Sequence, residues 1–212
     1  MRSASLLLVV LSACNTEIVD PPASGPASVR ERLVETATRL MISDADSAGT
    51  ITVQRKLAGG EWETGLVNLS IDQGEVVASA DPESGGITIE KFSLALDPIE
   101  IPRSVFNREA SLSHVRAELN RPALVTTTWS DDNTAHLTTT LELAFSWSLT
   151  VEGNTSGLGA PELPPLTLSI DVSGDGSIVH ADIDAGAGGE LWSWAGLLKL
   201  QDLSLVLAAE TP

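Results

Sequence analysis

LTTTLELAFSWSLTV, residues 137–151, is the stretch of sequence that decides the fold class. Apolar and polar side chains alternate along it, which is typical of a β-strand with one buried face and one solvated face. At roughly 3.3 Å per residue, one strand of this length would reach about 46 Å, so we expect it to bend around a core. The positions in the apolar phase are Leu137, Thr139, Leu141, Leu143, Phe145, Trp147, Leu149 and Val151.

The same alternation continues through most of the chain after about residue 48, beginning with Ile51 and Val53. Its phase changes near Glu90-Lys91 and again at Gln201-Asp202. One extra residue in a strand moves every later side chain to the opposite face. We therefore predict a β-bulge near Glu90-Lys91.

Glycine and proline clusters divide the alternating segments. Ser173-Gly-Asp-Gly176 predicts the turn of a β-hairpin. Residues 157–165 and 185–189 are rich in glycine or proline and are predicted to interrupt strands. With these breaks, the pattern predicts about nine or ten antiparallel strands.

One helix is predicted, over about residues 29–42. Ser28 and Glu31 have the spacing of a capping box, in which both side chains accept hydrogen bonds from unpaired N–H groups of the first turn. Apolar residues then recur at helical spacing and form one face. They are Val29, Leu33, Ala37, Leu40 and Met41. The order of elements predicts an all-β, mainly antiparallel fold: a curved sheet, half-barrel or sandwich with one N-terminal amphipathic helix.

The N-terminus has the pattern of a secretory signal: Arg2, then the short apolar run of residues 6–11. Leu11-Ser12-Ala13-Cys14 resembles the lipobox of bacterial lipoproteins. The resemblance covers these first residues alone. It implies cleavage just before Cys14, a diacylglycerol on the Cys14 thiol and an acyl chain on the new amine. Stable anchoring takes two or more such chains.

The domain organisation follows from this resemblance and from composition. We expect a signal peptide at 1–13, a lipidated cysteine with a flexible Pro/Gly-rich tether at 14–27, and a single β-rich domain at 28–212. Cys14 is the only cysteine, so no disulfide framework is expected. Asn15 is not the aspartate that marks inner-membrane retention in enteric bacteria, which favours the outer membrane. The expected location is the bacterial cell envelope.

A formal net charge of −17 narrows the range of partners. Phosphate backbones require clustered lysine and arginine, so nucleic acid is not expected. The same charge opposes docking on anionic lipid headgroups. The membrane partner is therefore expected to be reached through the lipid on Cys14.

No motif predicts catalysis or a cofactor. His114, His136 and His180 lack zinc-ligand spacing and are predicted to be solvent-facing strand residues. G-x-S-x-G, P-loop and dinucleotide patterns are absent from the sequence. The protein is therefore predicted not to be an enzyme and to carry no cofactor or metal.

Two stretches leave alternatives open. Asp171, Asp175 and Asp182 match part of a calcium-binding loop, but their flanks alternate like strands and favour a hairpin turn. Trp192 and Trp194 share one face of an extended segment, where packing at the core or its rim is favoured over a ligand platform.

Two functions fit this pattern. The first is the binding of a lipid or other apolar ligand in a cavity lined by strands such as 137–151. The second is a non-catalytic structural or protein-interaction β-sandwich at the cell envelope. The two differ in whether the inner face is filled.

Overall fold

The computed structural model describes residues 26–158, 164–194 and 198–212. Within these residues the strands form one 13-stranded sheet whose neighbouring strands are antiparallel. This confirms the predicted all-β class and exceeds the predicted number of strands. The strands are β1 (Thr38–Ile42), β2 (Ala48–Lys56), β3 (Trp62–Ala80), β4 (Ile87–Leu96), β5 (Ile99–Ile101), β6 (Ala110–Leu119), β7 (Ala123–Asp131), β8 (Thr134–Leu141), β9 (Leu143–Val151), β10 (Asn154–Leu158), β11 (Leu166–Gly174), β12 (Val179–Trp194) and β13 (Leu198–Glu210).

The sheet closes on itself through β3 and β4. β3 pairs with β2 on one side and with β4 on the other, and the order β2-β13-β12-β11-β8-β7-β4 completes the ring. The first part of β4, Ile87–Ile89, pairs with β7, whereas Ser93–Ala95 pairs with β6. β4 is therefore the strand at which a second branch, β6-β9-β10, leaves the ring.

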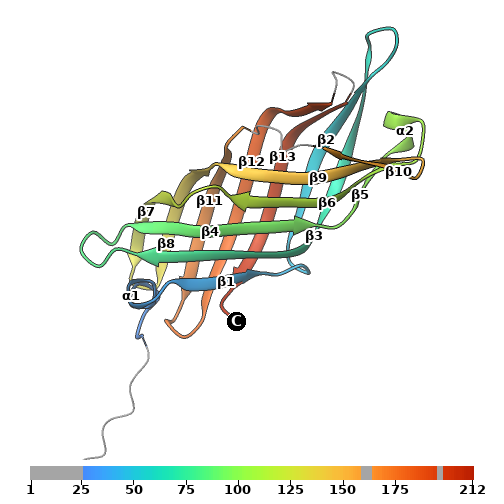
Figure 1. The fold of residues 1–212 in the computed structure, drawn as a ribbon. Helices are drawn as coiled ribbons and strands as arrows, with labels where there is room; N and C mark the ends of the chain where they lie inside the picture. Colours follow the sequence, from blue (N-terminus) through green and yellow to red (C-terminus); the bar gives the residue numbers. More distant parts are fainter. Residues whose placement is uncertain (1–25, 159–163, 195–197) are drawn as a thin grey trace, which may run out of the picture.

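The result is two layers joined at their edges. In Figure 1, β1, β4, β6 and β9 run across the front, and β11, β12, β13 and β2 slant behind them. β3 belongs to both layers because its first half pairs with β2 and its second half with β1 and β4. The fold thus combines the predicted sandwich and curved sheet.

Residues 137–151 form two strands and not one. β8 ends at Leu141 and β9 begins at Leu143, so the break falls at Glu142. β8 pairs with β11 in the back layer, and β9 pairs with β6 in the front layer. The alternation itself is correct on both sides of the break. Leu137, Leu141, Trp147 and Leu149 are buried, and their polar neighbours face outward.

The predicted bulge is present, and the phase slip at Gln201-Asp202 is a second irregularity in strand pairing. Val77 pairs with Lys91 and Ala78 with Ile89, which leaves Glu90 as the extra residue. The pairing of β13 with β2 shifts between Gln201 and Ser204. The predicted break at 185–189 is wrong, because β12 runs through it with a register shift between Ala187 and Glu190.

The N-terminal helix is shorter than predicted. α1 (Val29–Glu35) has the predicted cap, with the Glu31 N–H donating to Ser28 Oγ at 3.2 Å. It ends at Glu35, and Leu40 and Met41 lie in β1. Along 38–42 burial alternates: Thr38, Leu40 and Ile42 are buried, and Arg39 and Met41 are exposed. The free edges of β3 and β13 provide backbone partners for the extended form, and this long-range pairing decides the outcome.

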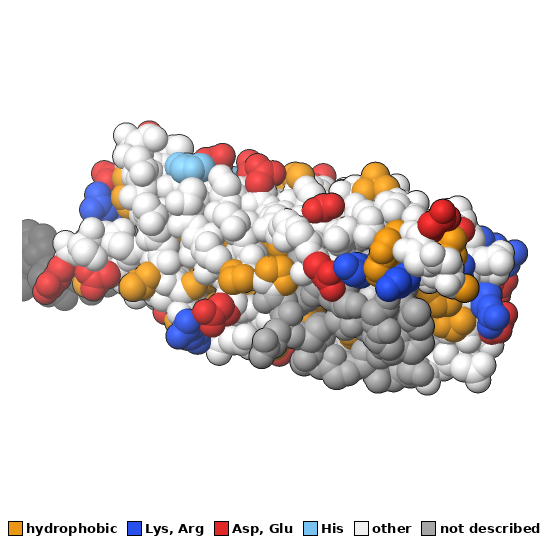
Figure 2. All heavy atoms as spheres, turned by 90° about the horizontal axis from the view of Figure 1, so that it is seen from above, with side chains coloured by type: hydrophobic (Ala, Val, Ile, Leu, Met, Phe, Trp, Pro, Cys, Tyr) orange, Lys and Arg blue, Asp and Glu red, His pale blue; other side chains and the backbone are white. Residues whose placement is uncertain are grey.

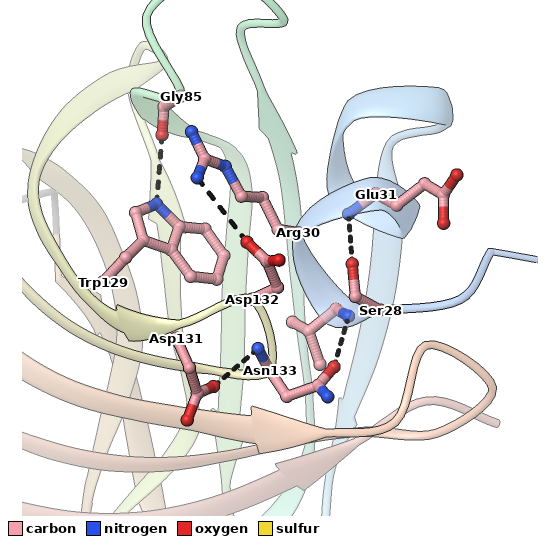
Figure 3. Close-up of polar contacts among 9 residues, drawn as sticks. Ser28, Arg30, Glu31, Gly85, Trp129, Asp131, Asp132 and Asn133 are labelled. Atoms are coloured by element: carbon pink, nitrogen blue, oxygen red, sulfur yellow. Dashed lines mark hydrogen bonds and ion pairs between the residues drawn. The ribbon is translucent and has the colours of Figure 1, made fainter.

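α1 closes one end of the sheet. Val29 and Leu33 are buried against it, and the Val29 N–H donates to Asn133 Oδ1 at 3.1 Å. Arg30 pairs with Asp132 at 3.7 Å and lies 5.6 Å from the centre of the Trp129 ring. Figure 3 shows Asp132 and Asn133 reaching α1 from the turn between β7 and β8, and Trp129 of β7 donating to the Gly85 carbonyl oxygen in the β3–β4 turn.

The β11–β12 turn also packs against the start of α1. Arg32 donates to the carbonyl oxygens of Gly176 and Ser177. Gly176 has a φ of +80°, and a Cβ there would lie 2.5 Å from the Pro26 carbonyl oxygen. Only glycine fits both the left-handed backbone and this close approach.

We expect Gly176→Ala to lower the free energy of unfolding by about 2–3 kcal/mol, because it adds a steric clash to the cost of a left-handed alanine. Gly60→Ala is the matched control, since Gly60 has a φ of +87° and open space around it. That control should lose about 1 kcal/mol. Urea unfolding followed by tryptophan fluorescence measures the free energy of unfolding of both variants. Equal losses would mean that the β11–β12 turn does not pack closely against the start of α1.

α2 (Arg103–Phe106) covers the opposite end. Val105 is fully buried and approaches Gly65 of β3 closely enough to occupy the place of a Cβ there. Arg55 donates to the Phe106 carbonyl oxygen at 2.7 Å and lies 5.5 Å from the centre of its ring. Neither helix of the described chain has the length and apolar content to span a bilayer.

The buried side chains between the layers form one continuous core. Outside it, large hydrophobic side chains are exposed singly, with Leu124 and Leu66 the most exposed. Figure 2 shows the same on the face seen from above, where hydrophobic atoms surface in small separate patches among polar and charged ones. Among the described residues, scattered exposure of this kind is ordinary for a protein surface.

Candidate functional site

An apolar cavity of about 50 Å³ lies between the layers, in the half of the domain away from α1. The front layer contributes side chains from β4, β5, β6 and β9, and the back layer contributes them from β2, β3, β11, β12 and β13. The residues that line it are Ile51, Leu69, Leu94, Leu96, Ile99, Leu112, Val115, Ala117, Leu143, Phe145, Trp147, Pro164, Leu166, Ala187, Leu200, Leu203 and Leu205.

Two bulges shape this cavity from opposite sides. On β6, His114 has a φ of +54°, and His114 and Val115 together face the single residue Trp147 of β9. On β13, Asp202 has a φ of +51°, and the pairing with β2 shifts there in the same way. The bulges turn Val115 and Leu203 inward, so both line the cavity.

The lining residues are apolar and exclude water. None of the described residues around the cavity carries a titratable side chain. Leu143, Phe145 and Leu203 are half-buried, while most of the other lining side chains are buried. An apolar chain could gain roughly 0.8 kcal/mol for each methylene placed there.

The size of the cavity sets a limit. A volume of about 50 Å³ exceeds what a single water needs. It is well below the roughly 300–1,000 Å³ of ordinary ligand pockets. Any ligand longer than a few carbons therefore requires the half-buried side chains or the layers to move.

The one residue to which the sequence assigns a chemical role, Cys14, lies outside the described residues, as does most of the predicted tether. Trp192 and Trp194 belong to β12, where their backbones pair with Leu200 and Leu198. Their side chains lie outside the part of the chain that the structure describes, so it does not distinguish packing from a ligand platform.

The three histidines lie on the outer surface, as predicted. His136 Nδ1 is 2.7 Å from Asp171 Oδ1, and His180 Nδ1 is 3.3 Å from Glu210 Oε2. Within the described chain, no group of three or more histidine, cysteine, aspartate or glutamate side chains has the geometry to hold a metal ion.

The structure favours the hairpin turn over the calcium-binding loop at Asp175. Asp175 Oδ1 accepts hydrogen bonds from the Ser177 hydroxyl, the Ser177 N–H and the Ile178 N–H, at 2.6 to 3.0 Å. These bonds, led by that from the Ser177 hydroxyl, hold the pKa of the Asp175 carboxyl below its ordinary value. Asp171 and Asp182 face each other across β11 and β12, away from this turn.

The prediction of an apolar inner face correctly placed Leu143, Phe145 and Trp147 at the cavity. It missed Val115 of β6. The signal was present in the sequence, because the apolar phase changes between Leu112 and Val115 as it does at Gln201-Asp202.

No family model matches this chain, and no curated protein matches it. Among solved structures, the crystal structure of Ail, the attachment invasion locus protein of Yersinia pestis, is similar over 82% of this chain and 99% of that chain, at 6% sequence identity and a TM-score of 0.34. A TM-score this low transfers neither the fold nor the role of Ail. The function therefore has to come from the residues of this chain.

Proposed function

We propose that the protein is a lipoprotein of the bacterial cell envelope, held by the lipid on Cys14, whose β-domain binds the hydrocarbon part of an apolar ligand between its layers. The observation that carries the binding proposal is that every described residue lining the cavity is apolar. The lipobox resemblance and the tether at 14–27 support the anchor and favour the outer membrane. The proposed protein is not an enzyme and needs no cofactor.

Binding would start at the half-buried side chains. Phe145 and Leu203 reach the cavity from opposite layers and are partly solvated. Rotation of these two side chains would enlarge the apolar cavity without breaking strand pairing. Their burial by a ligand would then offset part of the cost of moving them.

The small volume favours a second candidate function. With about 50 Å³ of free space, the same fold could be a filled, non-catalytic module that binds an envelope protein through its surface. Both candidates share the anchor. They differ in whether a methylene chain enters between the layers.

Ala117→Leu tests the first candidate. Ala117 is buried and lines the cavity, so a leucine would fill the space that a ligand needs. We expect the Cys14→Ser chain, which carries no lipid of its own, to bind a dansyl-labelled fatty acid, and the added Ala117→Leu change to weaken that binding at least about tenfold, the loss of roughly two methylenes of burial.

Ala135→Leu is the matched control, since Ala135 is equally buried but lies outside the cavity lining. It should bind the probe as the parent does, despite a similar overpacking cost of about 1–3 kcal/mol in stability. If the parent chain binds no fatty acid and no lipid copurifies with it in native mass spectrometry, the filled module is the correct function.

A further inference from the structure

Arg116 of β6 stands apart from the other basic residues. Lysine and arginine number 12 against 29 acidic residues, so a partner for each is easily found. Across residues 26–158, 164–194 and 198–212, every other lysine and arginine makes an ion pair, a hydrogen bond or a cation–π contact. Arg116 makes none among the described residues and is exposed.

This free guanidinium lines a hollow of about 200 Å³ on the outer face of the front layer. Small residues form the middle of the hollow: Ser93 lies opposite Glu118, and Ala95 lies opposite Arg116. Longer side chains from the flanking strands form its wall. They are Arg39 and Met41 of β1, Gln73 and Glu75 of β3, and Arg116 and Glu118 of β6.

Glu75 holds the opposite wall in place. Its side chain is 11% exposed, and it is the one buried ionisable residue in the described chain. It accepts hydrogen bonds from Lys91 and from Arg39 Nε, the latter at 2.5 Å. The bond from Lys91 and then that from Arg39 keep the pKa of the Glu75 carboxyl below its ordinary value, although burial raises it.

The pairing through Nε leaves the far end of Arg39 available. In the described chain, neither terminal nitrogen of Arg39 makes a hydrogen bond, and Arg39 is half exposed on the wall of the hollow. A guanidinium presents a planar fork of donors that matches the paired oxygens of a carboxylate or phosphate. Two such forks thus border one concave site, and one of them is fixed by a buried carboxylate.

We propose that this hollow binds a singly charged oxyanion, a carboxylate or a phosphodiester, between Arg116 and Arg39. Ser93 and Gln73 supply neutral hydrogen-bonding groups beside it. Glu118 and the overall charge of −17 oppose a second negative charge on the ligand. This site lies on the outer face of the front layer, whereas the apolar cavity lies on its inner face; Leu94 and Ala117 line both.

The test follows the arginine Nε–H signals of the ¹⁵N-labelled Cys14→Ser chain during titration with sodium acetate and with dimethyl phosphate, at constant ionic strength set by sodium chloride. We expect the Arg116 and Arg39 signals to shift and saturate. The matched control is Arg121, which is exposed and already paired with Glu142. Equal, unsaturating shifts at all exposed arginines would overturn the proposal, since they report only a diffuse ion atmosphere.

Two variants sharpen the outcome. Arg116→Gln should weaken binding at least about tenfold, the loss expected for a charge-assisted hydrogen bond, and Arg121→Gln should leave it unchanged. Glu118→Gln should strengthen binding by removing a like charge. Unchanged affinity in Arg116→Gln, or weaker binding in Glu118→Gln, would overturn the oxyanion site.

Sedimentation with phosphatidylglycerol vesicles distinguishes the sources of the oxyanion. If the Cys14→Ser chain cosediments with them and Arg116→Gln prevents this, the ligand is a lipid headgroup. If the chain stays in solution while the acetate and dimethyl phosphate shifts persist, the ligand is a soluble anion. Both results support the site.

Discussion

Replacement of Phe92 by alanine should lower the free energy of unfolding by about 3–5 kcal/mol. Phe92 is 1% exposed and is among the largest fully buried side chains. It lies on β4 between the segment that pairs with β7 and the segment that pairs with β6. Because β4 is hydrogen-bonded to β3 as well, the backbone around Phe92 cannot collapse into the space that the ring leaves.

Urea unfolding followed by tryptophan fluorescence measures this loss. Leu124→Ala is the control, because Leu124 is 83% exposed, and it should change the free energy of unfolding by less than about 0.5 kcal/mol. A loss under about 1 kcal/mol for Phe92→Ala would mean that the strands around Phe92 can close the space left by the ring, and that the pairing of β4 does not hold them in place.

The fold class follows from local pattern alone. Alternation over 137–151 places Leu141 and Trp147 on the buried face without knowledge of any partner strand. The bulge at Glu90 is also local, because one inserted residue reverses the phase of all that follow. These features depend on the chain's own sequence, which is why they could be predicted.

Features that depend on pairing with distant strands could not be predicted from the sequence. The switch from helix to strand after Glu35 depends on free edges of β3 and β13 that lie far away in sequence. The division of 137–151 at Glu142 depends on β11 pairing with β8 and on β6 pairing with β9. Alternation specifies which face is buried, but it does not specify the layer to which a strand belongs.

The candidate sites divide in the same way. Phe145 belongs to a clear apolar phase, so its place at the cavity follows from the sequence. The hollow on the outer face does not, because Arg39, Glu75 and Arg116 come from three strands. Each is an ordinary solvent-facing charge until β1, β3 and β6 are brought into one layer.

The largest effect on location is expected from Cys14→Ser. If the lipobox is processed, the wild-type chain carries more than one acyl chain and partitions firmly into membranes, since each buried methylene contributes about 0.8 kcal/mol. The serine variant has no thiol to accept the diacylglycerol. We expect it to lose incorporation of labelled palmitate and to move from the membrane fraction to the soluble fraction.

Thr16→Ala is the matched control for that experiment, because it changes the tether just beyond the motif and leaves residues 11–14 intact. It should be labelled as the wild type is. Equal palmitate labelling of wild type and Cys14→Ser would remove the anchor from the proposed function. It would not count against ligand binding in the cavity, because the tether of residues 14–27 joins the domain at α1, the end away from the cavity. Loss of the anchor and loss of fatty-acid binding are therefore separable outcomes of the Cys14→Ser and Ala117→Leu changes.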